Sequence, residues 1–245
     1  MQQIFVDANQ VFDNRVEVVG QDAKHLARVV RIRVGEKIRV SIHGGKNYFA
    51  NVSVVEKDRV VAEIIEESGD TEASNHIYLF QGLPKGSKFE TIIEKTVELG
   101  VYEIIPVEMK NCVVKLDDKK KESKIRRYQA VAESAAKQSK RSIIPHVHDV
   151  MTYDEALRYA EEISEVKLLP YENKDGMLAT KRALDKIKPD TSVSIFIGPE
   201  GGFSKDEIEK SKDMDIISLG KRILRTETAA IVSVAMLMLH NEFNE

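Results

Sequence analysis

The sequence contains no tryptophan and only one cysteine, Cys112, in 245 residues. A single thiol cannot build a disulfide framework or a cysteine zinc cluster, and it fits a reducing compartment. The longest apolar stretch, Ala229 to Leu239 with Ser233 inside it, is too short to cross a bilayer. The first residues lack the basic-then-apolar layout of a signal peptide. These absences predict a soluble, cytoplasmic protein.

Aromatic residues are also scarce, at 6% of the chain, so the sequence shows no evident platform for stacking bases. No sustained repeat is present, which argues against coiled-coil and collagen-like classes. The hydrophobic content of 42% is too high for a disordered chain. A globular protein with one large or two modest domains remains.

The first part of the chain has the short apolar spacing of strands. Residues 37–42, 48–55 and 60–65 alternate between apolar and polar side chains, with turns between them. This pattern predicts a small antiparallel sheet or barrel, with one short helix at 23–30. Residues 66–72 offer nothing apolar to bury and are interpreted as a linker. We therefore expect a first domain over residues 1–70.

From His76 onward, strands alternate with helices, which predicts an α/β domain over residues 74–245 with a mostly parallel sheet and helices on both faces. Ser87 and Glu90 have the spacing of a capping box, and so do Ser204 and Glu207. The expected strands are 77–80, 103–107, 166–169, 193–197 and 216–219. The expected helices are 89–97, 122–139, 153–163, 175–186, 205–212 and 227–243.

Basic residues are concentrated between Lys110 and Arg141, where eleven Lys/Arg stand against four Asp/Glu, a balance of +7. The whole chain is −3, so the remainder carries −10. Such a stretch can attract a polyanion. A solvated helix face is the ordinary alternative. A second basic cluster between Lys24 and Arg39 shifts the balance modestly toward RNA.

The most specific local signal is a strand that runs into a glycine-rich turn, Gly198-Pro199-Glu200-Gly201-Gly202, and then into a helix. Glycines at the carboxyl end of a strand let the backbone approach a ligand closely. The turn contains neither the dinucleotide-binding nor the P-loop pattern. A tight strand-to-helix turn without a ligand is the alternative.

A second glycine-containing bend runs from Ser218 to Thr228 and precedes a helix that is apolar almost all round. Such a helix must be buried in the core or against another subunit. Thr226 or Thr228 is expected to cap it. Arg225 and Glu227 either serve the chemistry or form a structural ion pair.

Together, the segments 197–203 and 219–229 resemble the paired signature of the SPOUT class of RNA methyltransferases, and within it the ribosomal RNA small subunit methyltransferase E family. Segments 25–31, 95–101 and 132–139 agree with the same family. One departure is a valine within residues 27–31, where leucine is usual. Another is Asn111-Cys112-Val113 in place of an Arg-Ser segment, which is expected to alter an RNA contact without touching the two motifs.

The resemblance implies an N-terminal PUA-like β-barrel that binds RNA and a C-terminal SPOUT domain with a deep trefoil knot. It also implies a homodimer that acts on N3 of a uridine in 16S ribosomal RNA, in the small ribosomal subunit. S-adenosylmethionine would lie between three loops, at 169–172, 198–202 and 218–228. The expected cofactor-binding residues are Leu169, Tyr171, Ile197, Gly198, Pro199, Gly201, Gly202, Ser218, Leu219, Gly220, Arg222, Ile223, Leu224, Thr226 and Thr228.

Methyl transfer from a sulfonium needs no metal, but the proton on uridine N3 must leave. Arg225 is the candidate for stabilising the uridine anion, because its planar donors suit the two carbonyl oxygens that flank N3. Glu200 or Glu227 could orient the substrate or accept the proton, although a carboxylate of ordinary pKa is a weak base. The candidate RNA contacts are Arg28, Arg31, Lys85, Arg127, Lys137 and Arg141.

Two other hypotheses remain open: a related knotted enzyme that acts on a ribose 2′-oxygen or another base, and a ribosome assembly factor without catalysis. His146 and His148 have no third metal ligand nearby in the sequence, so we expect no metal site. Cys112 lacks the surroundings of a nucleophile.

Overall fold

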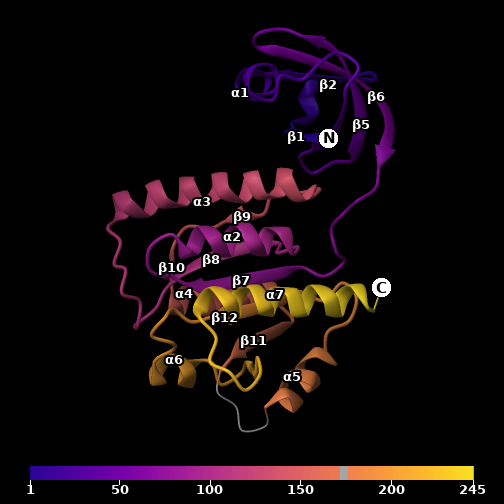
Figure 1. Ribbon diagram of the computed structural model, residues 1–245. Helices are drawn as coiled ribbons and strands as arrows, with labels where there is room; N and C mark the ends of the chain where they lie inside the picture. The colour runs from indigo at the N-terminus through magenta and orange to yellow at the C-terminus, as the bar shows by residue number, and fades with distance from the viewer. Residues whose placement is uncertain (172–175, 245) are drawn as a thin grey trace. The chain divides into compact units, whose positions relative to one another are not determined.

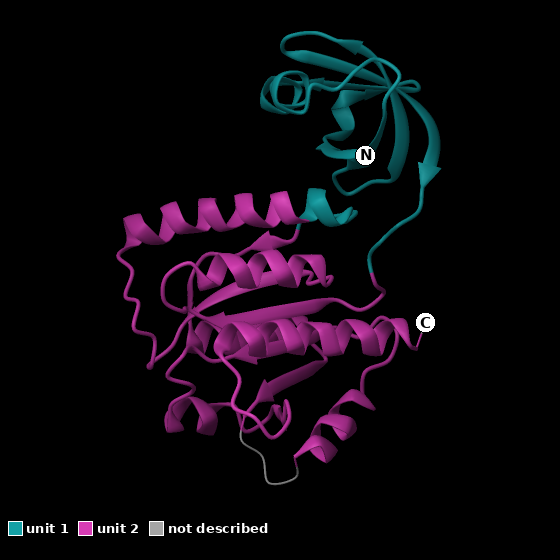
Figure 2. Cartoon of the chain, viewed as in Figure 1, with its two compact units in different colours: residues 1–72, 136–144 teal, residues 73–135, 145–245 magenta. Residues whose placement is uncertain are grey.

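The computed structural model describes residues 1–171 and 176–244 (Figure 1). The chain forms two compact units: residues 1–72 with 136–144, and residues 73–135 with 145–245 (Figure 2). Residues 136–144 thus belong to the first unit, although the sequence pattern placed them with the second. The expected limits of two domains, 1–70 and 74–245, stay a prediction.

The first unit is built on a six-stranded sheet in the order β1-β4-β5-β6-β3-β2. Its pairs are antiparallel except β1 with β4. The three expected strands are present, but β1, β2 and β3 were not foreseen. The elements are β1 (Gln2–Val6), β2 (Val11–Phe12), β3 (Arg15–Val19), α1 (Gly20–Lys24), a π-helix (His25–Val30), β4 (Lys37–Ile42), β5 (Asn47–Val55) and β6 (Arg59–Ser68).

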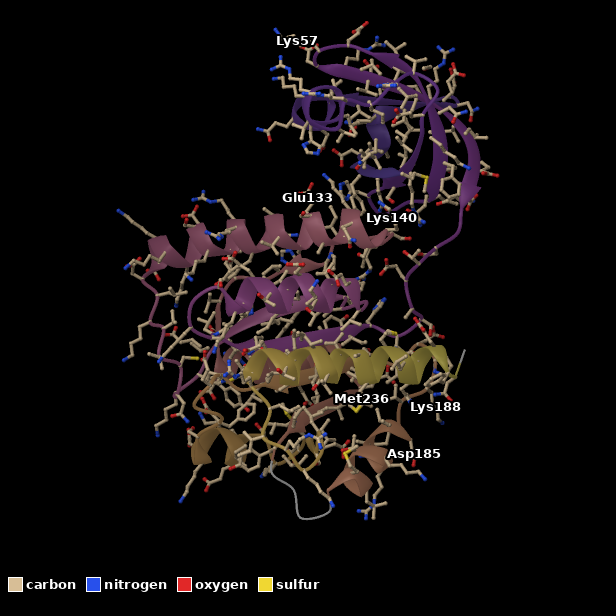
Figure 3. The ribbon with its side chains drawn as sticks, viewed as in Figure 1. Lys57, Glu133, Lys140, Asp185, Lys188 and Met236 are labelled. Atoms are coloured by element: carbon tan, nitrogen blue, oxygen red, sulfur yellow. The ribbon has the colours of Figure 1, made fainter. Side chains whose placement is uncertain are left out.

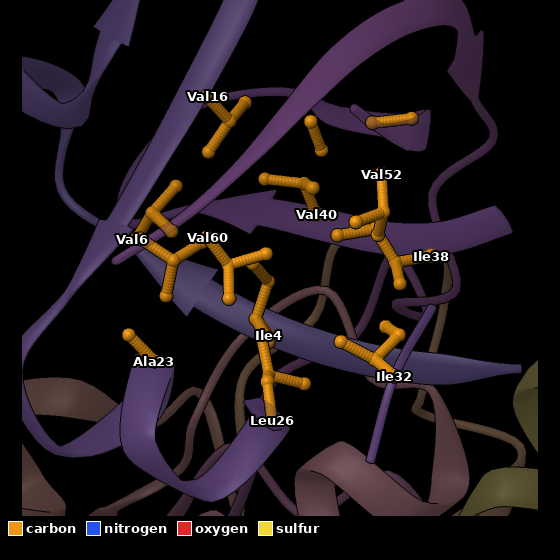
Figure 4. Close-up of a cluster of buried hydrophobic side chains, with 13 residues drawn as sticks. Ile4, Val6, Val16, Ala23, Leu26, Ile32, Ile38, Val40, Val52 and Val60 are labelled. Atoms are coloured by element: carbon orange, nitrogen blue, oxygen red, sulfur yellow. The ribbon is translucent and has the colours of Figure 1, made fainter. Parts of the chain in front are cut away.

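Aliphatic side chains from the sheet and from the short helices form the core of the first unit (Figure 4). Leu26, on the π-helix, and Ala23, on α1, pack against strand residues such as Ile4. Burying these apolar side chains closes the curled sheet on one side. The short helices therefore act as a lid on the core.

Residues 136–144 are bound to the first unit by polar contacts. The Arg141 side chain is only 5% exposed and forms an ion pair with Glu72, with Nε 3.0 Å from Oε1. Asn47 Nδ2 donates to Ser142 Oγ over 2.9 Å. The guanidinium is thus buried against its carboxylate partner, and the expected contact of Arg141 with RNA stays a prediction.

The second unit contains a parallel sheet in the order β10-β8-β7-β12-β11-β13, with β9 paired to β8. Each of its strand pairs is parallel, as expected. The strands are β7 (Ile77–Gly82), β8 (Glu103–Glu108), β9 (His146–Val147), β10 (Met151–Thr152), β11 (Val166–Pro170), β12 (Val193–Ile197) and β13 (Asp215–Ile217).

Helices cover both faces of this sheet. Phe80 on β7 packs near Tyr159 of α4, whereas the next residue, Gln81, donates to Thr226 of α7. Successive residues of a strand point to opposite faces, so α4 and α7 lie on opposite sides. The helices are α2 (Lys88–Glu98), α3 (Asp118–Ser139), α4 (Tyr153–Ile163), α5 (Met177–Leu184), α6 (Lys205–Lys210) and α7 (Thr226–Glu242). The expected start of α5 at residue 175 lies outside the described residues.

The helix starts follow the sequence signals only in part. Ser204 and Glu207 form the expected capping box of α6. Ser87 makes no side-chain capping bond, because its backbone, at φ −91° and ψ 5°, is outside the extended conformation of a capping residue. Neither threonine caps α7: Arg225 is its N-cap residue, and the Thr226 hydroxyl bonds elsewhere. The first expectation holds, and the other two are wrong.

The chain crosses back over the sheet before its last helix. β13 lies at the edge of the sheet beside β11. In contrast, α7 packs on β7 and β12 and against α2 (Figure 1). Residues 218–225 must therefore carry the chain from the edge back to the middle. This is the return path that the expected trefoil-knot domain needs. No helix of the described residues is long and apolar enough to span a membrane.

A half-buried polar cluster at the amino ends of the strands gives a prediction about pH. Burial raises the pKa of the Glu103 carboxyl, but hydrogen bonds from His148 at 2.7 Å and from Tyr159 at 2.9 Å outweigh it and hold the pKa below 4.5. A lowered pKa stabilises the fold above the unfolded-state value, and this contribution disappears as the pH falls through the folded-state pKa.

Glu103→Gln is therefore expected to lower the free energy of unfolding at pH 7 by about 1–3 kcal/mol. The difference from the wild type should shrink as the pH falls below 4.5. Urea unfolding between pH 3 and 7 (roughly the carboxylate titration range) measures it. A difference that stays constant across this range would contradict the prediction.

Candidate active site

A cavity of about 930 Å³ lies at the carboxyl ends of the parallel strands in the second unit. Three segments form its wall: the end of β11, the glycine-rich turn after β12, and the bend after β13. Its size falls within the usual range of about 300–1,000 Å³ for ligand sites. The lining residues are Pro170, Tyr171, Gly201, Gly202, Phe203, Ser218, Leu219, Gly220, Lys221, Arg222, Ile223, Leu224 and Ala229.

Most of the expected cofactor-binding residues line this cavity, namely Tyr171, Gly201, Gly202, Ser218, Leu219, Gly220, Arg222, Ile223 and Leu224. The others are Leu169, Ile197, Gly198, Pro199, Thr226 and Thr228, which are not in its wall. Leu169 and Ile197 are buried in the core of the sheet. Glu172 lies outside the described residues. The structure thus brings the two glycine bends together, as the sequence predicted.

The backbone of both bends depends on glycine. Gly202 adopts the left-handed backbone conformation that the turn requires, with φ +64°. Its N–H donates to the Pro199 carbonyl over 2.9 Å. Gly220 has φ +106°, a conformation that other residues avoid. At Gly201, an added Cβ would lie 2.9 Å from the Asn111 Cβ. The shape of the cavity wall is therefore fixed by residues without side chains.

Thr226 connects the start of α7 to the ends of two strands. Its hydroxyl donates to the Gly198 carbonyl over 2.7 Å and accepts from Gln81 Nε2 over 3.0 Å. Gln81 is fully buried on β7, so this network lies within the core of the unit. It holds the first glycine bend against α7. Thr226 is therefore placed as a support for the bend.

The candidate carboxylate Glu200 is already engaged. Its Oε1 accepts from Lys88 Nζ at 2.7 Å and from the Lys85 N–H at 3.1 Å. Burial raises the pKa of Glu200, but these bonds and the Lys88 charge lower it below its ordinary value. A carboxylate of lowered pKa is a poor proton acceptor. The geometry favours a role for Glu200 in fixing the turn to the start of α2.

Glu227 also faces Lys88, with Oε2 at 3.9 Å from Nζ. This oxygen is buried and has no hydrogen-bond donor among the described residues. A buried acceptor without a donor is costly, so the oxygen can take a donor from a ligand or from water. The expected alternative of an Arg225–Glu227 ion pair does not appear among the described residues, because the cation beside Glu227 is Lys88.

Arg225 is exposed at the start of α7, immediately after the second bend. Its guanidinium has no ion pair or hydrogen bond with any residue that the structure describes. Its backbone carbonyl is fixed by the Ala229 N–H at 2.8 Å, as the first bond of the helix. The backbone is therefore held while the guanidinium remains free to meet a negatively charged group.

The cavity suits the expected cofactor in its chemistry. Tyr171, Phe203 and Leu219 offer apolar contact for a planar ring, and the glycine turns allow a ligand to approach backbone donors and acceptors. Lys221 and Arg222 add positive charge beside the wall, which suits a carboxylate. S-adenosylmethionine carries an adenine ring and a carboxylate, so the residues present fit it.

Asn111 lies outside both motifs in the sequence but contacts the first of them in the structure. Its Nδ2 donates to the carbonyls of Gly201 and Gly202, over 3.0 and 3.1 Å. The adjacent Lys110 N–H donates to Glu207 Oε1 over 2.8 Å. These contacts join residues about 90 positions apart, and no sequence spacing signals them. The same holds for Gln81 and Lys88.

The remaining candidates separate by exposure. Arg28, Arg31 and Lys85 are exposed, which suits contact with RNA. Arg127 is exposed but pairs with Glu90 at 2.8 Å, and Lys137 pairs with Asp22 at 3.2 Å. In the described residues there is no cluster of three or more metal-ligating side chains. His148 binds Glu103, and Cys112 is buried with a raised thiol pKa caused by that burial.

Comparisons with known proteins give the same picture. An RNA methyltransferase domain model matches residues 71–238, and an RNA methyltransferase PUA domain model matches residues 20–65. The ribosomal RNA small subunit methyltransferase E of Bacillus subtilis is 34% identical over 231 residues, covering 92% of this chain and 90% of the relative.

Two solved structures with bound cofactor are similar over nearly the whole chain. One is a ribosomal RNA small subunit methyltransferase E from Neisseria gonorrhoeae bound to S-adenosyl methionine: TM-score 0.84, 31% identity, 98% of this chain and 97% of that one. The other is a putative methyltransferase from Legionella pneumophila with bound SAM: TM-score 0.83, 29% identity, 97% and 96% covered.

Proposed function

Because the chain belongs to the ribosomal RNA small subunit methyltransferase E family and is an S-adenosylmethionine-dependent methyltransferase of 16S ribosomal RNA, we propose that it methylates N3 of a uridine in the small ribosomal subunit. The observation that carries this proposal is the cavity between the two glycine bends, together with Arg225, which directly follows Leu224 of the cavity wall and whose guanidinium has no partner among the described residues. The protein would act in the cytoplasm, where small subunits assemble.

S-adenosylmethionine supplies a methyl group on a sulfonium, which transfers to a nucleophile without a metal. The chain must hold the uracil in line and stabilise the negative charge that develops when the N3 proton leaves. Arg225 meets the second need, because a guanidinium offers planar donors to a carbonyl oxygen next to N3. Glu200 holds the first turn, since its bonds to Lys85 and Lys88 keep it ionised and occupied. The proton passes to solvent.

The two units divide the work. We assign RNA binding to residues 1–70, where Arg28 and Arg31 are exposed, and catalysis to residues 74–245. Lys85 lies three residues before the start of α2, where its N–H donates to Glu200. It is a candidate contact for the phosphates around the target base. Arg127 and Lys137 would have to exchange a carboxylate partner for phosphate.

The test is to incubate the protein with methyl-labelled S-adenosylmethionine and undermodified small subunits, and then to locate the label by mass mapping of nucleosides. Label on N3 of a uridine supports the proposal. Label on a ribose 2′-oxygen or on another base would replace it with the related enzyme activity. Subunit binding without label, unchanged by an inert cofactor analogue, would indicate an assembly factor.

A homodimer is also part of this proposal, because α7 has an apolar outer face. Val232, Leu239 and Phe243 are 39%, 45% and 82% exposed, and their spacing places them on one side of the helix. Met236, which lies between them in the sequence, is on the same helix (Figure 3). A second copy of the same face would cover this stripe.

Leu239→Glu is therefore expected to convert the dimer to a monomer, raising the dissociation constant at least about 100-fold, since a carboxylate would be buried in an apolar contact. Light scattering after size exclusion should show a change from twice the 27.7 kDa chain mass to that mass. Val113→Glu places the same charge at an exposed apolar residue outside α7 and should leave the dimer mass unchanged. A monomeric wild type would contradict the proposal.

A further inference from the structure

Asn111 lies behind the glycine-rich turn and outside the cavity. It follows β8, and its Nδ2 donates to two successive carbonyls, those of Gly201 and Gly202. Both glycines line the cavity, but Asn111 does not. The amide therefore contacts the turn without being part of the cavity wall.

Two further contacts support the bond between Asn111 and the glycine-rich turn. Next to it, the Lys110 N–H donates to Glu207, whose other oxygen accepts from the Ser204 N–H at 2.7 Å. At Gly201, an added Cβ would lie 3.1 Å from the Asn111 carbonyl oxygen as well as against its Cβ. The backbone of residues 109–112 and the turn are therefore packed as one piece, and the turn has little freedom to shift.

The direction of the two carbonyls fixes the direction of the neighbouring N–H groups. A trans peptide is planar, and its C=O and N–H point to opposite sides. The N–H of Gly202 is used by the Pro199 carbonyl. The N–H of Phe203 shares a peptide with the Gly202 carbonyl, so it points away from Asn111. It has no hydrogen-bond partner in the part of the chain that the structure describes.

We propose that Asn111 is a positioning residue for S-adenosylmethionine: it draws the Gly201 and Gly202 carbonyls out of the cavity wall, so that the Phe203 N–H faces the ligand as a donor. The Phe203 N–H then donates to a hydrogen-bond acceptor of the cofactor, namely a ring nitrogen, a ribose oxygen or the carboxylate. Without the Asn111 amide, the Gly202 carbonyl can rotate toward the cavity and present an acceptor to the same group, whereas the Gly201 carbonyl is still held through the bond of the Gly202 N–H to Pro199. This inference rests on the proposed function.

Two variants test the proposal. Asn111→Asp has nearly the same shape but replaces the donor by a carboxylate that repels both carbonyls, and Asn111→Ala removes the amide without adding a charge. We expect the dissociation constant for S-adenosylmethionine, measured by isothermal titration, to rise about 10-fold in Asn111→Ala and about 100-fold in Asn111→Asp. The KM for S-adenosylmethionine should rise in the same order, with kcat and the KM for small subunits within about twofold of wild type.

Lys110→Ala is the matched control, because it changes the neighbouring exposed side chain and keeps the backbone bond to Glu207. It should bind the cofactor as the wild type does. Cofactor affinity unchanged in both Asn111 variants would overturn the proposal, and so would a fall in kcat alone. If Asn111→Asp does not fold, the affinity of Asn111→Ala for S-adenosylmethionine tests the proposal by itself. A wild type that binds no S-adenosylmethionine would instead overturn the proposed function.

Discussion

Replacing Arg225 by alanine is expected to slow methyl transfer by about 100- to 1,000-fold, the usual effect of removing one donor to a developing oxyanion. Arg225 is exposed and directly follows Leu224 of the cavity wall, and its guanidinium has no partner among the described residues, so its loss leaves no buried group unpaired. Stability and cofactor binding should therefore change little. The loss belongs in kcat, measured at saturating S-adenosylmethionine and small subunits.

Arg225→Lys should recover only part of the rate, because an ammonium keeps the charge but lacks the planar pair of donors. The matched control is Arg15→Ala, which removes an exposed arginine of the first unit that pairs with Glu63. It should leave kcat unchanged. A rate for Arg225→Ala within threefold of wild type (roughly 0.6 kcal/mol in the barrier) would show that another group stabilises the anion.

The parallel sheet of the second unit was predictable from the sequence for a clear reason. Strands buried on both faces are continuous apolar runs, and amphipathic helices separate them, so both element types leave distinct patterns. The placement of the cavity follows as well, because the carboxyl ends of parallel strands meet at one edge. Both glycine bends lie there.

The helix caps show that the local sequence alone does not determine whether a capping box forms. Ser204 and Ser87 both precede a glutamate at the capping-box spacing, yet only Ser204 forms the box. At Ser87 the glutamate is taken by Arg127, which lies 37 residues away in the chain. The Ser87 backbone, at φ −91° and ψ 5°, is outside the extended conformation that Ser204 adopts at φ −77° and ψ 162°, and the spacing of Ser and Glu in the sequence does not reveal this difference.

The residues that support the site were missed for the same physical reason. Asn111 reaches the glycine turn across about 90 residues, and Gln81 reaches Thr226 across 145. Similarly, residues 136–144 join the first unit through Arg141 and Glu72, which are 69 positions apart. Such contacts form only once the sheet is packed. Sequence motifs reflect only the requirements of the local backbone and of the ligand.

The second large effect is expected at Thr226, where valine has nearly the same shape and lacks the hydroxyl. Thr226 is 6% exposed, and its hydroxyl bonds to the carbonyl of the half-buried Gly198 and to the buried Gln81 Nε2, which also donates to the Gly82 carbonyl. In Thr226→Val both groups remain in the core without this partner. Each unsatisfied buried group costs about 1–3 kcal/mol, so the free energy of unfolding should fall by about 2–4 kcal/mol in urea titrations.

Thr226→Ser separates the hydroxyl from the packing. Serine keeps both hydrogen bonds and loses one buried methyl, so it should cost about 1 kcal/mol. If the network holds the start of α7 against the first glycine bend, the valine variant should also lose affinity for S-adenosylmethionine, while the serine variant keeps it. Equal stability of the two variants would mean that the Gly198 carbonyl and Gln81 find other partners, and that the return of the chain over the sheet is secured by apolar packing alone.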